Sequence, residues 1–153
     1  MKIYLDANII YGFFKNIINE ERKGKKFTDP SILKFLKESK LELYTSVLVK
    51  AEIARRLRTE WGCSAEEVIE LWNSFEDYLN SKMIETAIID SQIVDIATKI
   101  PMKKRISNMM HLLIAKQYDL WFLTGDKEII EKCKPAFDKI ISYIELRRKI
   151  HVS

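Results

Sequence analysis

The sequence predicts a single α/β domain built on a mostly parallel sheet that helices cover on both faces. Short apolar runs alternate with segments in which apolar residues recur every three or four positions, a pattern typical of strands alternating with helices. Only four of the 153 residues are glycine and three are proline, which favours long regular elements. The chain is long enough to bury a core of its own. We therefore expect one domain over residues 1–145, followed by a basic and loose tail at residues 146–153.

The N-terminal part of the chain predicts a strand, two helices and a second strand. Residues 3–5 are apolar and β-prone, as in a strand buried on both faces. Apolar residues at helical spacing follow over residues 9–21. Asp29 can cap the next helix, because aspartate oxygens accept hydrogen bonds from the free backbone N–H groups of a helix start. Residues 41–44 predict the second strand.

Serine residues mark the starts of two helices in the middle of the chain. Ser46, or the preceding threonine, can cap a helix that ends at Gly62. Ser64 and Glu67 form the capping-box pattern of the helix after it. The later predicted elements are a strand at 83–85, a helix to about residue 99 capped by Asp90, a helix at 108–117 capped by Ser107, a strand at 120–124, a helix at 127–132 and a strand at 139–144.

Composition and charge narrow the class of protein. Hydrophobic residues make up 47% and charged residues 31%, and no apolar run approaches the roughly 20 residues that span a bilayer. We expect a cytoplasmic protein that does not enter a membrane, with Cys63 and Cys133 as free thiols. The net charge of +4 fits a polyanionic partner. The basic clusters are Arg22, Lys23, Lys25 and Lys26; Arg55, Arg56 and Arg58; Lys103, Lys104 and Arg105; and Arg147, Arg148 and Lys149.

Three acids and one carboxamide recur near the ends of predicted strands. Asp6 and Asp126 each follow a strand, Glu52 lies in the helix after the second strand, and Asn108 opens the helix that leads to the strand at 120–124. Open α/β sheets bind ligands at the carboxyl ends of their strands. Hard cations such as Mg²⁺ and Mn²⁺ prefer oxygen ligands. The four side chains are therefore predicted to form a metal site that cleaves phosphodiester bonds.

Each candidate also has a purely structural interpretation. Asp6 can cap a helix, Asp126 can be a turn residue after Gly125, and Glu52 can be a solvated helix residue. His111 could serve as a general base, but we expect a packed or hydrogen-bonded structural histidine.

Four short motifs, in this order, resemble the PIN domain family. They occupy residues 5–8, 45–53, 108–115 and 123–128, and the resemblance spans residues 3 to about 143. It implies a three-layer α/β/α sandwich and a Mg²⁺- or Mn²⁺-dependent endoribonuclease, as in the small VapC-type toxins. It also implies that Asp6, Glu52 and Asp126 are metal-site acids. The supporting polar residues that it implies around the ion are Asn8, Ser46 and Thr124.

Asn108 departs from the family pattern. The family normally has Asp at this position, followed three residues later by His, which here is His111. Asn offers an oxygen but no charge, so the site carries three carboxylates instead of four. Because ion affinity depends on ligand charge, we expect weaker metal binding and slower turnover. The sequence leaves open whether Asn108 is natural or an inactivating substitution.

The leading functional hypothesis is a ribonuclease toxin that hydrolyses RNA with metal-activated water and is neutralised by a small antitoxin protein. A homodimer is expected, and the apolar residues Phe13, Phe14, Phe35 and Leu36 could serve its interface. The alternative is a catalytically weak or inactive PIN-like module for RNA binding or assembly, which Asn108 favours. A phosphatase or a DNA nuclease could use the same acids.

Overall fold

The computed structural model describes residues 1–85, 90–99 and 106–152. Within them, one sheet runs in the order β3-β2-β1-β4-β5, and every neighbouring pair of strands is parallel. The strands are β1 (Lys2–Leu5), β2 (Glu42–Ser46), β3 (Lys82–Ile84), β4 (Trp121–Leu123) and β5 (Ile140–Ile141). The helices are α1 (Ala7–Lys23), α2 (Ser31–Glu38), α3 (Val47–Trp61), α4 (Ala65–Leu79), α5 (Asp90–Lys99), α6 (Ile106–Gln117), α7 (Lys127–Lys132) and α8 (Tyr143–Val152).

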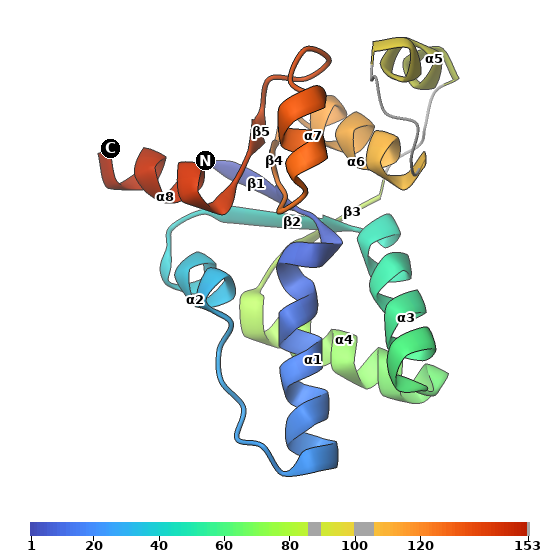
Figure 1. Ribbon diagram of the computed structural model, residues 1–153, viewed down its shortest axis with the longest axis vertical. Coiled ribbons are helices and arrows are strands. Elements are labelled where there is room, and N and C mark those ends of the chain that lie inside the picture. The colour runs from blue at the N-terminus through green and yellow to red at the C-terminus, as the bar shows by residue number, and fades with distance from the viewer. Residues whose placement is uncertain (86–89, 100–105, 153) are drawn as a thin grey trace.

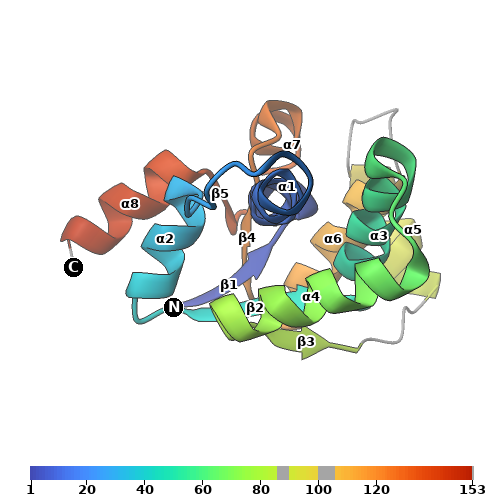
Figure 2. The same cartoon turned by 90° about the horizontal axis from the view of Figure 1, so that it is seen from below.

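The helices form two layers around the sheet. Helices α1 to α4 lie on one side, and α5, α6 and α7 lie on the other (Figure 1). Helix α8 lies beside α2, as the view from below also shows (Figure 2), and the rings of Phe35 and Tyr143 meet there at 5.6 Å. The predicted three-layer α/β/α sandwich with a parallel sheet is confirmed.

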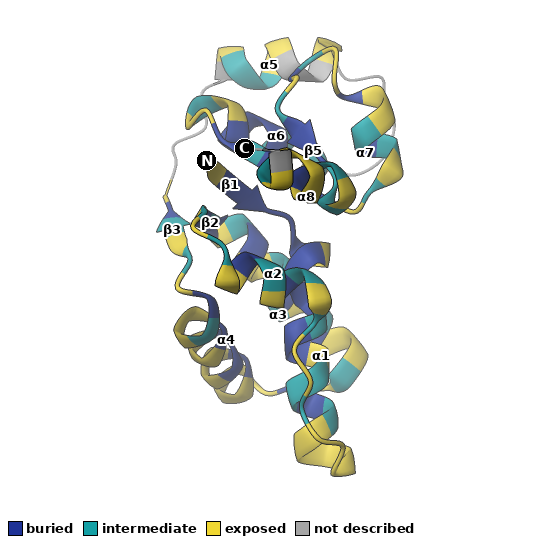
Figure 3. Ribbon diagram, turned by 90° about the vertical axis from the view of Figure 1, so that its left-hand side faces the viewer, coloured by how far each residue is buried: buried dark blue, intermediate teal, exposed yellow. Residues whose placement is uncertain are grey.

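The core is centred on β1. Ile3, Tyr4 and Leu5 are fully buried, because β1 has a strand on each side and a helix layer on each face. Buried residues occupy the strands and the helix faces turned towards them, whereas the far end of α1 is exposed (Figure 3). Trp72 and Phe75 of α4 pack with the aromatic residues of α1 in this core.

Burial corrects the predicted dimer interface. Phe13, Phe14 and Leu36 are at most 2% exposed, because they pack inside the subunit. They are therefore not available to a second copy of the folded chain. Phe35, which is half-buried, contacts α8.

Helix starts follow the predicted caps at Ser46 and Ser64 and depart from them at Asp29 and Ser107. Ser46 accepts the backbone N–H of Val49, and Ser64 and Glu67 form both bonds of a capping box. Asp29 does not cap α2, because Pro30 occupies the capping position and no side chain bonds the free N–H groups there. Helix α6 begins at Ile106, so Ser107, predicted as its cap, lies within its first turn.

The C-terminal segment differs from the prediction. Strand β5 ends at Ile141, and α8 follows from Tyr143 to Val152, so the predicted strand to residue 144 and the loose tail are wrong. Tyr143, Leu146 and Ile150 recur at helical spacing, and Leu146 is fully buried. Because the apolar run before them is typical of a strand, the change from strand to helical spacing was not recognised in the sequence.

Three further predictions concern the cysteine thiols, the basic cluster at residues 103–105 and the absence of a membrane-spanning segment. Cys63 and Cys133 are buried thiols that are not joined by a disulfide, and burial raises the pKa of the Cys133 thiol to about 11. Lys103, Lys104 and Arg105 lie outside the described residues. In the part of the chain that the structure describes, no helix is long and apolar enough to cross a membrane.

Candidate metal site at the sheet edge

One cleft of about 470 Å³ brings the four predicted ligands together. Asp6, Glu52, Asn108 and Asp126 all line it. Asp6 and Asp126 reach it from the ends of β1 and β4, which are neighbouring parallel strands, and the other two reach it from α3 and α6. Four segments that are far apart in the sequence therefore meet at the carboxyl edge of the sheet.

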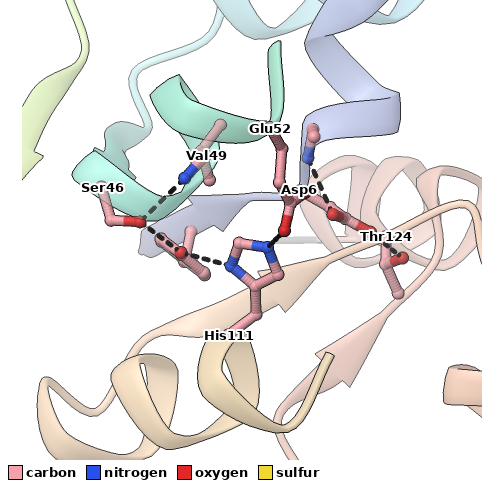
Figure 4. Close-up of polar contacts among 8 residues, drawn as sticks. Asp6, Ser46, Val49, Glu52, His111 and Thr124 are labelled. Carbon is pink, nitrogen blue, oxygen red and sulfur yellow. Dashed lines mark hydrogen bonds and ion pairs between the residues drawn. The ribbon is translucent and has the colours of Figure 1, made fainter. Parts of the chain in front are cut away.

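Asp6 is the most buried acid of the cleft, with 4% of its surface exposed. Its Oδ1 accepts the N–H of Ala7 at 2.7 Å, and its Oδ2 accepts the hydroxyl of Thr124 at 2.6 Å (Figure 4). Burial raises the pKa of Asp6, and the nearby Glu52 raises it further, while His111 and these hydrogen bonds oppose the rise. A positive ion in the cleft would favour the ionised form of this carboxyl group.

Asp126 combines a capping role with a place in the cleft. Its Oδ1 accepts the backbone N–H groups of Glu128 and Ile129, which fixes the carboxylate at the start of α7. Thr124 accepts the N–H of Asp126 at 3.1 Å while it donates to Asp6. Thr124 therefore links the two strand-end acids, and Asp126 caps α7 and lines the cleft at the same time.

Glu52 is held by His111, and the expectation of a packed, hydrogen-bonded histidine is confirmed. His111 is fully buried, and its Nε2 lies 2.8 Å from Glu52 Oε1, while its Nδ1 lies 2.6 Å from the hydroxyl of Tyr4. Tyr4 in turn contacts Ser46 Oγ at 2.7 Å. Of the three predicted supporting residues, Ser46 and Thr124 are buried in such networks, and Asn8 is exposed on the cleft wall.

The donor set fits a hard divalent cation. Carboxylate oxygens of Asp6 and Glu52 lie within 4.8 Å of each other and of a ring nitrogen of His111, and Asn108 and Asp126 add oxygens on the same cleft. Within the described residues, no Lys or Arg forms an ion pair with any of the three acids. Uncompensated carboxylates at one site repel each other, and Mg²⁺ or Mn²⁺ would neutralise them.

Sequence reasoning missed the role of Tyr4 and did not identify Glu52 as the partner of His111. Tyr4 lies two residues before Asp6 on a strand, and residues at that spacing point to the same face. A buried tyrosine hydroxyl also needs a hydrogen-bond partner. These two signals together could have placed Tyr4 near the site, but its partners Ser46 and His111 are 42 and 107 residues away, and no local pattern identifies them.

The fold and the cleft define an α/β/α protein with an acidic site, of the kind that binds cations, at the edge of a parallel sheet. The family model described as PIN domain matches residues 3–135, and the chain therefore belongs to the PIN domain family, whose members are generally metal-dependent nucleases. Among solved structures, the chain is similar to the "Crystal Structure of PAE2754 from Pyrobaculum aerophilum", with a TM-score of 0.58 and 14% identity over 100% of this chain and 97% of that chain. This likeness supports the fold alone. Among proteins with curated descriptions, none matches the sequence.

Proposed function

We propose that this PIN domain is a Mg²⁺- or Mn²⁺-dependent endoribonuclease that acts as the toxin of a toxin–antitoxin pair. The observation that carries the nuclease part is the meeting of Asp6, Glu52, Asn108 and Asp126 in one cleft. The toxin role, the RNA substrate and a cytoplasmic location rest on the resemblance to small VapC-type proteins and on composition.

The proposed mechanism divides the work between a cation and fixed side chains. When bound, a divalent cation lowers the pKa of a water molecule and stabilises negative charge on the scissile phosphate. Asp6, Glu52 and Asp126 would hold it with their carboxylates, and Asn108 with its carboxamide oxygen. Thr124 keeps Asp6 in place through its hydroxyl, and the start of α7 keeps Asp126 in place through two backbone N–H groups.

Replacing Glu52 with glutamine tests the nuclease proposal. Glu52→Gln keeps the size of the side chain and removes one of three charges, so we expect weaker Mn²⁺ binding by calorimetry and an RNA cleavage rate lower by about two orders of magnitude. Glu70→Gln on the exposed face of α4 is the matched control and should behave as the unchanged protein. EDTA should stop cleavage, and competition between RNA and DNA substrates separates the two nuclease types. Cleavage that persists in EDTA or in Glu52→Gln would reject the proposed metal mechanism.

Arg55 is our candidate for holding the RNA backbone at the cleft. It lines the cleft one helical turn from Glu52, and its exposed side chain contacts no described residue by an ion pair or hydrogen bond. Its neighbour Arg56 is already held, since its guanidinium lies 3.5 Å over the ring of Tyr11 and pairs with Glu60 at 3.2 Å. Arg55 is therefore the freer cation for a phosphate group.

Arg55→Gln is expected to weaken RNA binding across sequences and to reduce the slope of log affinity against log salt by about one, because one phosphate contact is lost. Fluorescence anisotropy in EDTA measures this binding while the RNA stays intact. Arg58→Gln, an exposed position of the same helix outside the cleft, is the control. Equal salt slopes for all three proteins would remove Arg55 from the RNA surface.

The proposed partners are a small antitoxin protein and a second copy of the chain. An antitoxin segment would inhibit the enzyme by covering the acidic cleft, and a basic side chain on it would pair with the acids there. Light scattering of the protein alone tests the homodimer, and monomers at high concentration would contradict it.

Asn108 favours a second candidate function. With only three carboxylates in the cleft, the chain could serve as an RNA-binding or assembly module with little or no catalysis. RNA binding without cleavage in Mg²⁺ and in Mn²⁺ would support this module.

A further inference from the structure

A continuous row of buried side chains lies behind the cleft and ends on Glu52. The hydroxyl of Tyr4 lies 2.7 Å from Ser46 Oγ on one side and 2.6 Å from His111 Nδ1 on the other. The second ring nitrogen, Nε2, lies 2.8 Å from Glu52 Oε1. Figure 4 shows Ser46, His111 and Glu52 of this row. Tyr4, Ser46 and His111 are at most 1% exposed, so the row is closed to solvent up to the carboxylate.

When every donor of the row is matched with an acceptor, the hydrogen bonds all point the same way, from Ser46 through Tyr4 and His111 to Glu52. A carboxylate has no proton to donate, so His111 Nε2 donates to Glu52. Ser46 Oγ accepts the N–H of Val49 at 3.3 Å, and the oxygen of Tyr4 at 2.7 Å is the acceptor within reach of its own proton. The Tyr4 hydroxyl then donates to His111 Nδ1, and every polar hydrogen of the row has an acceptor.

Reversing the hydrogen bonds between His111, Tyr4 and Ser46 would cost free energy. A proton on His111 Nδ1 would turn the Tyr4 hydroxyl towards Ser46. The hydroxyl proton of Ser46 would then have no acceptor among the described residues, and an unpaired buried donor costs about 1–3 kcal/mol. The row therefore selects the imidazole tautomer that carries its proton on Nε2.

Packing fixes the imidazole ring as well. The ring of Phe122 lies 5.9 Å from that of His111 at an interplanar angle of 24°, and the ring of Tyr4 lies 5.6 Å away at 50°. With both nitrogens bonded and two rings against it, the imidazole has one orientation. Hydrogen bonds of this kind are how proteins orient the carboxylates that hold metal ions.

We infer that Tyr4 and His111 are positioning residues that hold the Glu52 carboxylate facing Asp6 across the cleft. His111 acts as a hydrogen-bond donor to Glu52, and not as an ion ligand or a general base. Tyr4 acts one step further away by determining which ring nitrogen carries the proton. The orientation of Glu52 follows from these contacts alone, whereas its consequence for ion binding rests on the proposed function.

Imidazole NMR tests the inference without any activity. The chain has only two histidines, His111 and the exposed His151, so a ¹⁵N-labelled sample of the full chain gives two resolvable ring patterns. We expect His111 as a single tautomer with Nε2 protonated, both without ions and with Mg²⁺ added. A proton on Nδ1 in the ion-free protein, or loss of the Nε2 proton on addition of Mg²⁺, would overturn the inference. This measurement needs no variant.

Tyr4→Phe removes the donor to Nδ1 and keeps the ring. We expect the His111 pattern to shift towards a mixture of tautomers and the dissociation constant for Mn²⁺ to rise about tenfold, the lower end of the range for partners of metal ligands. Tyr44→Phe is the matched control, because Tyr44 pairs with Tyr4 in register on β2 and its hydroxyl lies outside the row. It should leave both the His111 pattern and the Mn²⁺ affinity unchanged.

The combined outcomes separate the two proposals. If the unchanged protein binds no Mn²⁺, the proposed function fails, and the tautomer of His111 still decides the positioning role. If the protein binds Mn²⁺ and Tyr4→Phe leaves either the tautomer or the Mn²⁺ affinity unchanged, the positioning role is wrong and the proposed function stands.

Discussion

Replacing Asp6 with asparagine is expected to abolish metal-dependent RNA cleavage and to raise the melting temperature of the ion-free protein. Asp6 is 4% exposed, and burial raises its pKa because the charged carboxylate is poorly solvated there. The asparagine side chain would keep an oxygen for the N–H of Ala7 and would remove the buried charge. We expect a rate at least about a hundredfold lower, since a metal ion supplies several kcal/mol of transition-state stabilisation.

The gain in stability should depend on pH in a defined direction. An acid whose pKa is raised in the folded state contributes stability below its unfolded pKa, about 3.9, and loses that contribution as pH rises through the folded value. The raised pKa of Asp6 therefore lowers the free energy of unfolding of the ion-free protein at neutral pH. Asp6→Asn has no such group, so the variant keeps its free energy of unfolding as pH rises. The difference in free energy of unfolding between the variant and the unchanged protein should therefore grow from acidic to neutral pH.

Denaturant titrations in EDTA at several pH values measure this advantage. Asp77→Asn on the exposed surface of α4 makes the same chemical change without burial, and it should not reproduce the pH-dependent gain. An Asp6→Asn protein that is less stable than the unchanged protein at neutral pH in EDTA would contradict the account of the buried charge. Added Mn²⁺ should stabilise the unchanged protein and have much less effect on the variant.

Replacing Asn108 with aspartate is expected to strengthen Mn²⁺ binding by at least about tenfold, which corresponds to about 1.4 kcal/mol. Asn108 lines the same cleft as the three acids, so the new carboxylate would add a fourth charge close to the ion. The same charge should destabilise the protein in EDTA, because it adds to the repulsion among the acids. Calorimetry with Mn²⁺ and thermal unfolding with and without the ion measure both effects.

The rate of RNA cleavage by Asn108→Asp distinguishes the enzyme from the binding module. A rise in rate alongside the rise in affinity supports a nuclease that Asn108 weakens. Asn73→Asp on the exposed face of α4 is the matched control and should alter neither quantity. Unchanged Mn²⁺ affinity in Asn108→Asp would show that residue 108 lies outside the metal site.

The acids of the cleft could be predicted from the sequence because each is tied to a local pattern. Asp6 and Asp126 follow strands that the apolar runs identify, and parallel strands bring their carboxyl ends to one edge. Glu52 and Asn108 lie on helices with recognisable periodicity. The position of each ligand therefore depends on the type and order of the elements, both of which the sequence predicts well.

The network behind the acids could not be predicted in this way. His111 and Glu52 are 59 residues apart, and their contact depends on side-chain rotamers and on the packing of Phe122 against the imidazole ring. The burial of Phe13 and Phe14 likewise depends on α4, which closes over α1. Periodicity shows which face of a helix is apolar, but it does not show whether the same chain or a second copy covers that face.

Crystals of the protein grown with Mn²⁺ offer the most direct test of the central claim, that the four side chains form one metal site. Data collected at the manganese absorption edge locate the ion by its anomalous signal. We predict a peak in the cleft at coordination distance, about 2.1 Å, from carboxylate oxygens that include those of Asp6 and Glu52. A fully occupied peak elsewhere, or no peak in the cleft when Mn²⁺ is present at millimolar concentration, would contradict the account.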